Sequence, residues 1–229
     1  MINILIYLLI CVSTAALLRW KVKLPNEIFR KTLHLIVLGL YAIWLFSFDD
    51  YKTDVISMIV SVLCIFPILL FLDRNPKFTK FINGREPGEL PVSLLLAGMS
   101  FVMVTALMWG GLNDRFLALA SFYSWGLGDA AAAIVGKRFG KIKIGKDKKK
   151  TLEGTLAMFA FAALGIFISL LIRHTVWNVP TVIMIFAAAA LCALVELYSP
   201  KGSDTLTCPF TTAMVITAFY LNGGIINVG

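Results

Sequence analysis

The sequence is short of charged residues and of long polar connections, and these shortages exclude several classes of protein. Only 15% of its 229 residues are charged, whereas 59% are apolar. A typical soluble domain carries about 25% charged residues, so a separate soluble catalytic domain is excluded. The four cysteines are isolated and form no Cys-x-x-Cys pair, which argues against a zinc site or a disulfide framework. Most of the chain is therefore available to cross a membrane.

Long apolar runs take the place of the missing polar segments. Eight stretches are uncharged or nearly so, and most of them reach the length of about 20 residues that a spanning helix needs. They are residues 2–18, 32–48, 55–72, 90–112, 116–136, 154–172, 175–199 and 205–229. We predict an all-α, polytopic integral membrane protein with about eight transmembrane helices, folded as a single transmembrane domain over residues 1–229.

The distribution of basic residues predicts the orientation. Three basic residues follow the first run and none precedes it, so we expect a retained span with the N-terminus outside. Alternation then puts the C-terminus outside and 18 of the 21 Lys and Arg residues on the inside. The inner face carries about +9 and the outer about −1, so topology accounts for the net charge of +8 without a nucleic-acid partner.

Ionisable residues inside spans are costly and are usually functional. His34, Asp129, Glu153 and Glu196 all fall in the predicted inner half, and we expect no charge to be buried within a span in the outer half. This one-sided placement predicts a polar site open to the cytoplasm and argues against a path through the bilayer.

Arg30, Lys31 and His34 form the first candidate group. Spacings of three and four residues place both cations on the helix face of the imidazole. Two cations facing a polyphosphate, with a neutral imidazole that accepts a hydroxyl proton, suit phosphoryl transfer. The alternative is that the cations extend to the interface while His34 bonds a neighbouring helix.

The second group is a stripe formed by Asp129, Ala132, Gly136 and Gly140. Steps of three and four residues place them on one helix face, where small residues admit a flat ligand or, alternatively, a closely packed helix. A lysine-rich loop over residues 141–150 follows and opens onto a predicted helix N-terminus. Such a loop suits a multiply charged phosphate or, alternatively, anionic lipid headgroups.

The third group lies around the last inner connection. Glu196 is one turn inside the membrane, where a carboxylate needs a cation or a metal. Asp204 either caps the eighth helix or belongs to a metal or nucleotide site.

Together these residues resemble the CTP-binding signature of the polytopic dolichol kinase family, which includes phytol kinases and a CTP-dependent diacylglycerol kinase. The middle block carries the resemblance: Asp129, Ala132, Gly136, Gly140, Lys149, Lys150, Thr151, Glu153 and Gly154. The resemblance implies that this block binds CTP and that the γ-phosphoryl group passes to the hydroxyl of a polyprenol, dolichol or phytol at the inner face of a cell or organelle membrane.

The chemistry suggests a role for each residue. We expect Asp129 and Glu153 to hold Mg²⁺ with help from Glu196 or Asp204. The expected phosphate contacts come from four cations, namely Arg30, Lys31, Lys149 and Lys150. His34 is the candidate base.

Three alternatives remain open at this point. Two are enzymes, a CTP-dependent diacylglycerol kinase and a phosphatidate cytidylyltransferase, which attacks the α-phosphate of CTP to make a CDP-lipid. The third is a transporter of an anionic or lipid substrate. A transporter usually has broken helices and inverted repeats, and the sequence shows no repeat. The sequence does not specify an oligomeric state.

Overall fold

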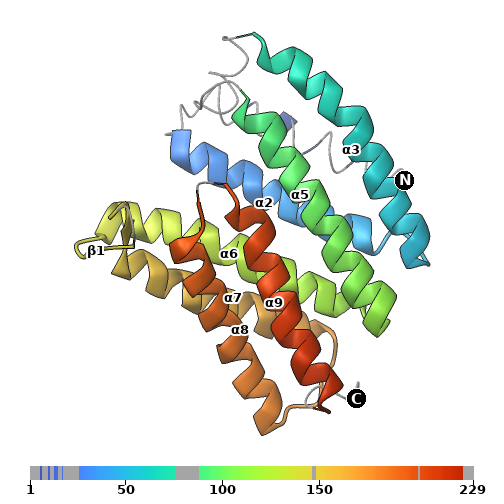
Figure 1. Ribbon diagram of the computed structural model, residues 1–229, viewed down its shortest axis with the longest axis vertical. Helices are drawn as coiled ribbons and strands as arrows, with labels where there is room; N and C mark the ends of the chain where they lie inside the picture. Colours follow the sequence, from blue (N-terminus) through green and yellow to red (C-terminus); the bar gives the residue numbers. More distant parts are fainter. Residues whose placement is uncertain are drawn as a thin grey trace. The chain divides into compact units, whose positions relative to one another are not determined.

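A computed structural model describes residues 26–75, 88–145, 148–200 and 202–223, together with residues 6, 10, 13, 14 and 17 (Figure 1). The described part is almost entirely helical. Six helical segments are long and apolar enough to cross a membrane. They are Ile28–Leu45, Tyr51–Asp73, Glu89–Gly111, Arg115–Phe139, Leu152–Ile172 and Val179–Tyr198. The prediction of an all-α membrane protein is confirmed.

The six segments correspond to the second through seventh predicted spans. Twelve of the 17 residues of the first predicted span, residues 2–18, lie outside the described residues. The eighth forms helix α9 (Asp204–Leu221), which is not among the six. Five threonines, Asp204 and Pro209 lower its mean hydropathy, so the count of eight spans and their orientation stay predictions.

The chain divides into two compact units, Met1–Val102 and Met103–Gly229. The described helices of the first are α2 (Asn26–Leu45), α3 (Tyr51–Asp73) and most of α5 (Glu89–Thr105). Asp50 caps α3 by accepting a 2.9 Å hydrogen bond from the Thr53 N–H. Hydrogen bonds from the Thr53 hydroxyl and N–H hold the pKa of Asp50 below its ordinary value.

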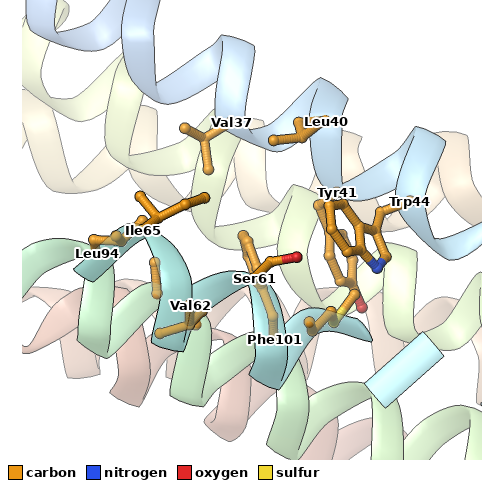
Figure 2. A pocket seen from close by; sticks show the side chains of 12 residues that line it. Val37, Leu40, Tyr41, Trp44, Ser61, Val62, Ile65, Leu94 and Phe101 are labelled. Atoms are coloured by element: carbon orange, nitrogen blue, oxygen red, sulfur yellow. The ribbon is translucent and has the colours of Figure 1, made fainter. Parts of the chain in front are cut away.

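The helices of the first unit line a partly open apolar cavity of about 120 Å³ (Figure 2). Side chains from all three helices line it, including Val37 from α2, Val62 from α3 and Leu94 from α5. Tyr41 and Phe101, which both line it, stack on each other with ring centroids 4.6 Å apart. Because its lining is apolar and one side is open, this cavity suits part of a hydrocarbon chain.

The second unit is a bundle of four long helices. A π-helical turn, η2 (Ala106–Gly111), continues from α5 and precedes α6 (Arg115–Phe139), α7 (Leu152–Ile172), α8 (Val179–Tyr198) and α9. α6 packs on α7 and α9, and α8 packs on α7 and α9. Short connections join these helices, so consecutive helices run antiparallel (Figure 1). The C-terminal ends of α6 and α8 therefore lie at the same end of the bundle as the N-terminal ends of α7 and α9.

Glycines bring α6 and α7 into close contact. A Cβ atom added at Gly165 would lie 2.6 Å from the carbonyl oxygen of Tyr123 on α6. At Gly128, an added Cβ would lie 2.5 Å from the sulfur of Met158 on α7. Since real Cβ atoms do not approach so closely, both positions require the absence of a side chain.

Two short strands break the all-helical pattern between α6 and α7. β1 (Lys143–Ile144) and β2 (Lys150–Thr151) pair antiparallel, with Lys143 opposite Thr151. Gly145 follows β1 with φ of +83°, a conformation that glycine adopts without strain. The lysine-rich loop is therefore a β-hairpin at the shared end of α6 and α7 (Figure 1).

The opposite helix ends of the second unit hold a buried ion pair. Arg173 donates to Asp114 through Nε at 2.5 Å and to the Thr175 hydroxyl at 3.0 Å. Asp114 also caps α6 by accepting from Phe116 N–H at 3.0 Å. Only 4% of the Arg173 side chain is exposed, so water compensates little of its positive charge and the Asp114 carboxylate compensates it instead.

Our expectation that buried charge within spans occurs only in the inner half is wrong. Asp54 lies in the first turn of α3, at the end predicted to face outside, and is fully buried. Asp54 was predicted to lie outside the span because the span was expected to start at residue 55, whereas α3 begins four residues earlier, at Tyr51. The Asp50 cap lets the helix start among charged residues.

Candidate functional site

The candidate site lies where four helix ends of the second unit meet. These are the C-terminal ends of α6 and α8 and the N-terminal ends of α7 and α9, with the hairpin between α6 and α7. The hairpin supplies Lys150, the last turn of α8 supplies Glu196, and Asp204 is the first residue of α9. Asp129 lies on α6, ten residues before the helix ends at Phe139.

An ion pair joins the hairpin to α8. Lys150 Nζ lies 2.8 Å from Glu196 Oε1 and also donates to the Glu196 backbone carbonyl. Gly145 packs beside Leu197, where an added Cβ would lie 3.2 Å from Leu197 Cδ1. These two contacts fix the hairpin over the end of α8.

Three carboxylates share this neighbourhood. Asp129 and Asp204 lie close enough to Glu196 to repel its negative charge, while Lys150 attracts it. The Glu196 side chain is 11% exposed and that of Lys150 is 33% exposed, so solvent screens their interaction only in part. The site therefore concentrates negative charge around one half-buried ammonium group.

Trp125 makes a contact with Asp204 that the sequence analysis did not predict. Its indole Nε1 donates to Asp204 Oδ2 at 3.3 Å, and the residue is buried on α6 one turn before Asp129. Asp204 is the first residue of α9, whereas Ser203 occupies the N-cap position without a side-chain cap bond. The carboxylate of Asp204 thus lies against Trp125, and both roles considered for Asp204 stay predictions.

Glu153 faces the turn that leaves α6. Its carboxylate accepts from the backbone N–H groups of Lys141 at 3.0 Å and Ile142 at 3.4 Å. Both bonds hold the loop against the start of α7. Glu153 thus has a structural function in the turn, and its predicted places in the metal, CTP and catalytic sets stay predictions.

The small residues of the stripe lie against the start of α7. A Cβ added at Gly136 would lie 2.9 Å from the Thr151 hydroxyl, and one at Gly154 would lie 3.0 Å from the Ala132 carbonyl oxygen. Gly140 also packs on Thr151, whose hydroxyl caps α7 by accepting from the Gly154 N–H at 3.2 Å. The stripe therefore brings the two helix ends together beside Asp129, and its predicted role in CTP binding stays a prediction.

The remaining predicted residues take no part in the contacts described above. Lys149 is exposed on the hairpin, just before β2. Arg30, Lys31 and His34 lie on α2 in the first unit, where Lys31 is buried with 7% of its surface exposed. Their participation in one site with the second unit stays a prediction.

The predicted metal ligands do not form a ready-made cage. Among the described residues, no three His, Cys, Asp or Glu side chains are placed to hold one ion. Mg²⁺ in phosphoryl-transfer sites is usually bound through one or two carboxylates together with substrate phosphates. Asp129 and its neighbours Glu196 and Asp204 offer oxygen ligands of the kind that such a site uses.

Comparison with known proteins gives one further observation. The chain is similar to dolichol kinase EVAN of Arabidopsis thaliana, with 35% identity over 82 residues. The matched region is 34% of this chain and 14% of that kinase, so the similarity covers a small part of both. No protein-family model matches the chain. No solved structure matches it either.

Proposed function

We propose that the protein is a lipid kinase that transfers the γ-phosphoryl group of CTP to the hydroxyl of a membrane lipid alcohol of the polyprenol, dolichol or phytol type. The observation that carries the proposal is the ion pair of Lys150 with Glu196, whose charge also interacts with Asp129 and Asp204. Phosphoryl transfer needs mainly positioning and neutralisation of charge, and both are available here. The partial similarity to a dolichol kinase supports the same reaction class.

We propose that Mg²⁺ binds here through one or two carboxylates together with the nucleotide phosphates. Asp129 is its first candidate ligand, with Glu196 and Asp204 beside it. When bound, the ion would neutralise charge on the phosphates. Trp125 keeps Asp204 in place, and Glu153 keeps the loop closed over the start of α7.

The cations of the hairpin and of α2 complete the proposal. Lys149 is exposed and Lys150 is partly exposed, so a triphosphate can reach both ammonium groups. Arg30 and Lys31 are proposed as further phosphate contacts, and His34 as the base that accepts the proton of the lipid hydroxyl.

The apolar cavity of the first unit supports a hydrocarbon acceptor. Its lining is aliphatic and aromatic except for Ser61, and its three helices are apolar enough to cross a membrane. We propose that part of the acceptor tail occupies it, because burying hydrocarbon against an apolar lining is favourable.

Turnover of labelled nucleotide by the purified protein in lipid nanodiscs tests the function. The protein is incubated with γ-labelled CTP or ATP and a panel of phytol, polyprenols and diacylglycerol. We expect the γ label of CTP in a phosphorylated alcohol. Label transfer only from α-labelled CTP would instead identify a cytidylyltransferase, and no transfer from any nucleotide would refute the kinase.

Two variants, Asp129→Asn and Glu153→Gln, distinguish a residue that binds the metal from one that only holds the loop in place. Asp129→Asn removes a charge beside Glu196, and we expect turnover to fall by at least about 100-fold, as for the loss of one strong electrostatic contact in a transition state. Glu153→Gln keeps an oxygen that accepts the Lys141 N–H, so turnover should stay near normal if Glu153 only holds the loop and should fall if it also binds the metal. Near-normal rates in Asp129→Asn would contradict the assignment of the metal.

A further inference from the structure

The turn from α6 into β1 exposes cations and apolar side chains together. We define the hairpin surface as six exposed residues: Lys137, Arg138, Phe139, Lys141, Ile142 and Lys143. Phe139 is 58% exposed and Ile142 is 56% exposed. The Arg138 guanidinium lies 5.4 Å from the centre of the Phe139 ring. Four cations therefore surround two large apolar side chains that the bundle does not cover.

The backbone around Ile142 is already satisfied within the protein. Its N–H donates to Glu153, and its carbonyl accepts from the Leu152 N–H at 2.9 Å. A peptide group that keeps its hydrogen bonds can enter an apolar environment without the penalty of an unpaired donor or acceptor. The Ile142 side chain can thus leave water without exposing unsatisfied backbone groups.

The length of α6 places this surface at a membrane boundary. Its 25 residues span about 37 Å, whereas the hydrocarbon core of a bilayer is about 30 Å thick. The last turn of α6 and the residues after it therefore reach the headgroup layer. Clusters of Lys and Arg next to a spanning helix bind anionic lipid headgroups.

We infer that the hairpin surface binds the anionic leaflet of the membrane, with its cations among the headgroups and with Phe139 and Ile142 inserted at the edge of the hydrocarbon. The charges complement an anionic lipid surface. A free nucleotide would use the cations but would leave both apolar side chains in water. A second copy of the chain would bring like charges together.

A fluorescence measurement on the full-length protein tests lipid contact without relying on turnover. The natural cysteines are replaced, Ile142→Cys is introduced, and an environment-sensitive dye is attached at that position. The labelled protein is placed in phosphatidylcholine nanodiscs with and without phosphatidylglycerol, each carrying spin-labelled lipids that quench the dye. We expect several-fold stronger quenching in the anionic nanodiscs, and high salt should reduce the difference.

Two charge variants at residues other than the proposed phosphate contacts Lys149 and Lys150 provide matched controls. The Gln variant changes Lys137, Lys141 and Lys143 to Gln and should lose the response to phosphatidylglycerol. The Arg variant changes the same residues to Arg and should keep it. Equal quenching in both nanodiscs, or a response that persists in the Gln variant, would overturn the inference. So would a response lost in the Arg variant as well.

Discussion

At the scale of single residues, the ion pair between Lys150 and Glu196 leads to a stability prediction. Lys150→Met leaves the Glu196 carboxylate without its cation and beside the charges of Asp129 and Asp204. An unpaired, largely buried polar group costs roughly 1–3 kcal/mol, and more when it is charged. We therefore expect a lower midpoint of thermal unfolding in detergent, whereas Lys149→Met, at an exposed neighbour, should change it little.

The double variant Lys150→Met with Glu196→Gln separates stability from function. It removes the unpaired charge, so the unfolding temperature should recover much of its loss. Turnover should stay low if Lys150 also contacts the nucleotide phosphates. A single Lys150→Met variant as stable as Lys149→Met would show that the ion pair contributes nothing to the fold.

The sequence identified several residues of the candidate site, but it did not predict most of the residues that they contact. Asp129, Glu196 and Asp204 attract attention because ionisable groups near spans are rare. Trp125 did not, because its contact with Asp204 joins residues 79 positions apart and depends on how α6 packs on α9. Nor does spacing alone reveal that the Glu153 carboxylate accepts two backbone N–H groups, beside its predicted role as a metal ligand.

At the scale of elements, the close approach of α6 and α7 depends on glycine. Gly165→Ala would push a methyl group into the carbonyl oxygen of Tyr123, 2.6 Å away. Overpacking of this kind costs about 1–3 kcal/mol, so the variant should unfold at a lower temperature in detergent.

Gly111→Ala is the matched control for that comparison. Its added Cβ meets only the Ala106 carbonyl oxygen, at the ordinary distance of 3.9 Å. We expect its unfolding temperature to stay close to that of the unmodified protein. Equal effects of the two substitutions would refute the claim that helix contact makes Gly165 necessary.

The elements themselves were largely predictable from apolar runs, and the exceptions have physical causes. α9 was counted as a span because no charge interrupts it after Asp204, but its threonines make it less apolar. The hairpin was missed because strands of two residues have no periodicity to detect. α3 begins before its predicted start because a capped helix tolerates charged residues in its first turn.

At the scale of the whole molecule, filling the cavity of the first unit should weaken binding of the lipid alcohol and leave binding of the nucleotide unchanged. Ala97 lines the cavity and is buried, so Ala97→Leu fills part of the space proposed for the acceptor tail. We expect a several-fold higher KM for the lipid alcohol and an unchanged KM for CTP. Ala160→Leu, on an exposed position of α7, is the control. Unchanged kinetics in Ala97→Leu would place the tail elsewhere.

The orientation of the whole chain follows from the charge asymmetry and can be measured directly. Lys52 is exposed in the first turn of α3 and is predicted to lie outside, whereas Lys143 is exposed on β1 and is predicted to lie inside. In a variant without natural cysteines, a membrane-impermeant maleimide should label Lys52→Cys in intact cells. It should label Lys143→Cys only after the membrane is opened. The reverse pattern would invert the topology and place the hairpin, and with it the proposed phosphate site, away from the cytoplasm, where CTP is made. Labelling of both positions in intact cells would break the alternation of spans, because an odd number of membrane crossings must separate two residues on opposite sides.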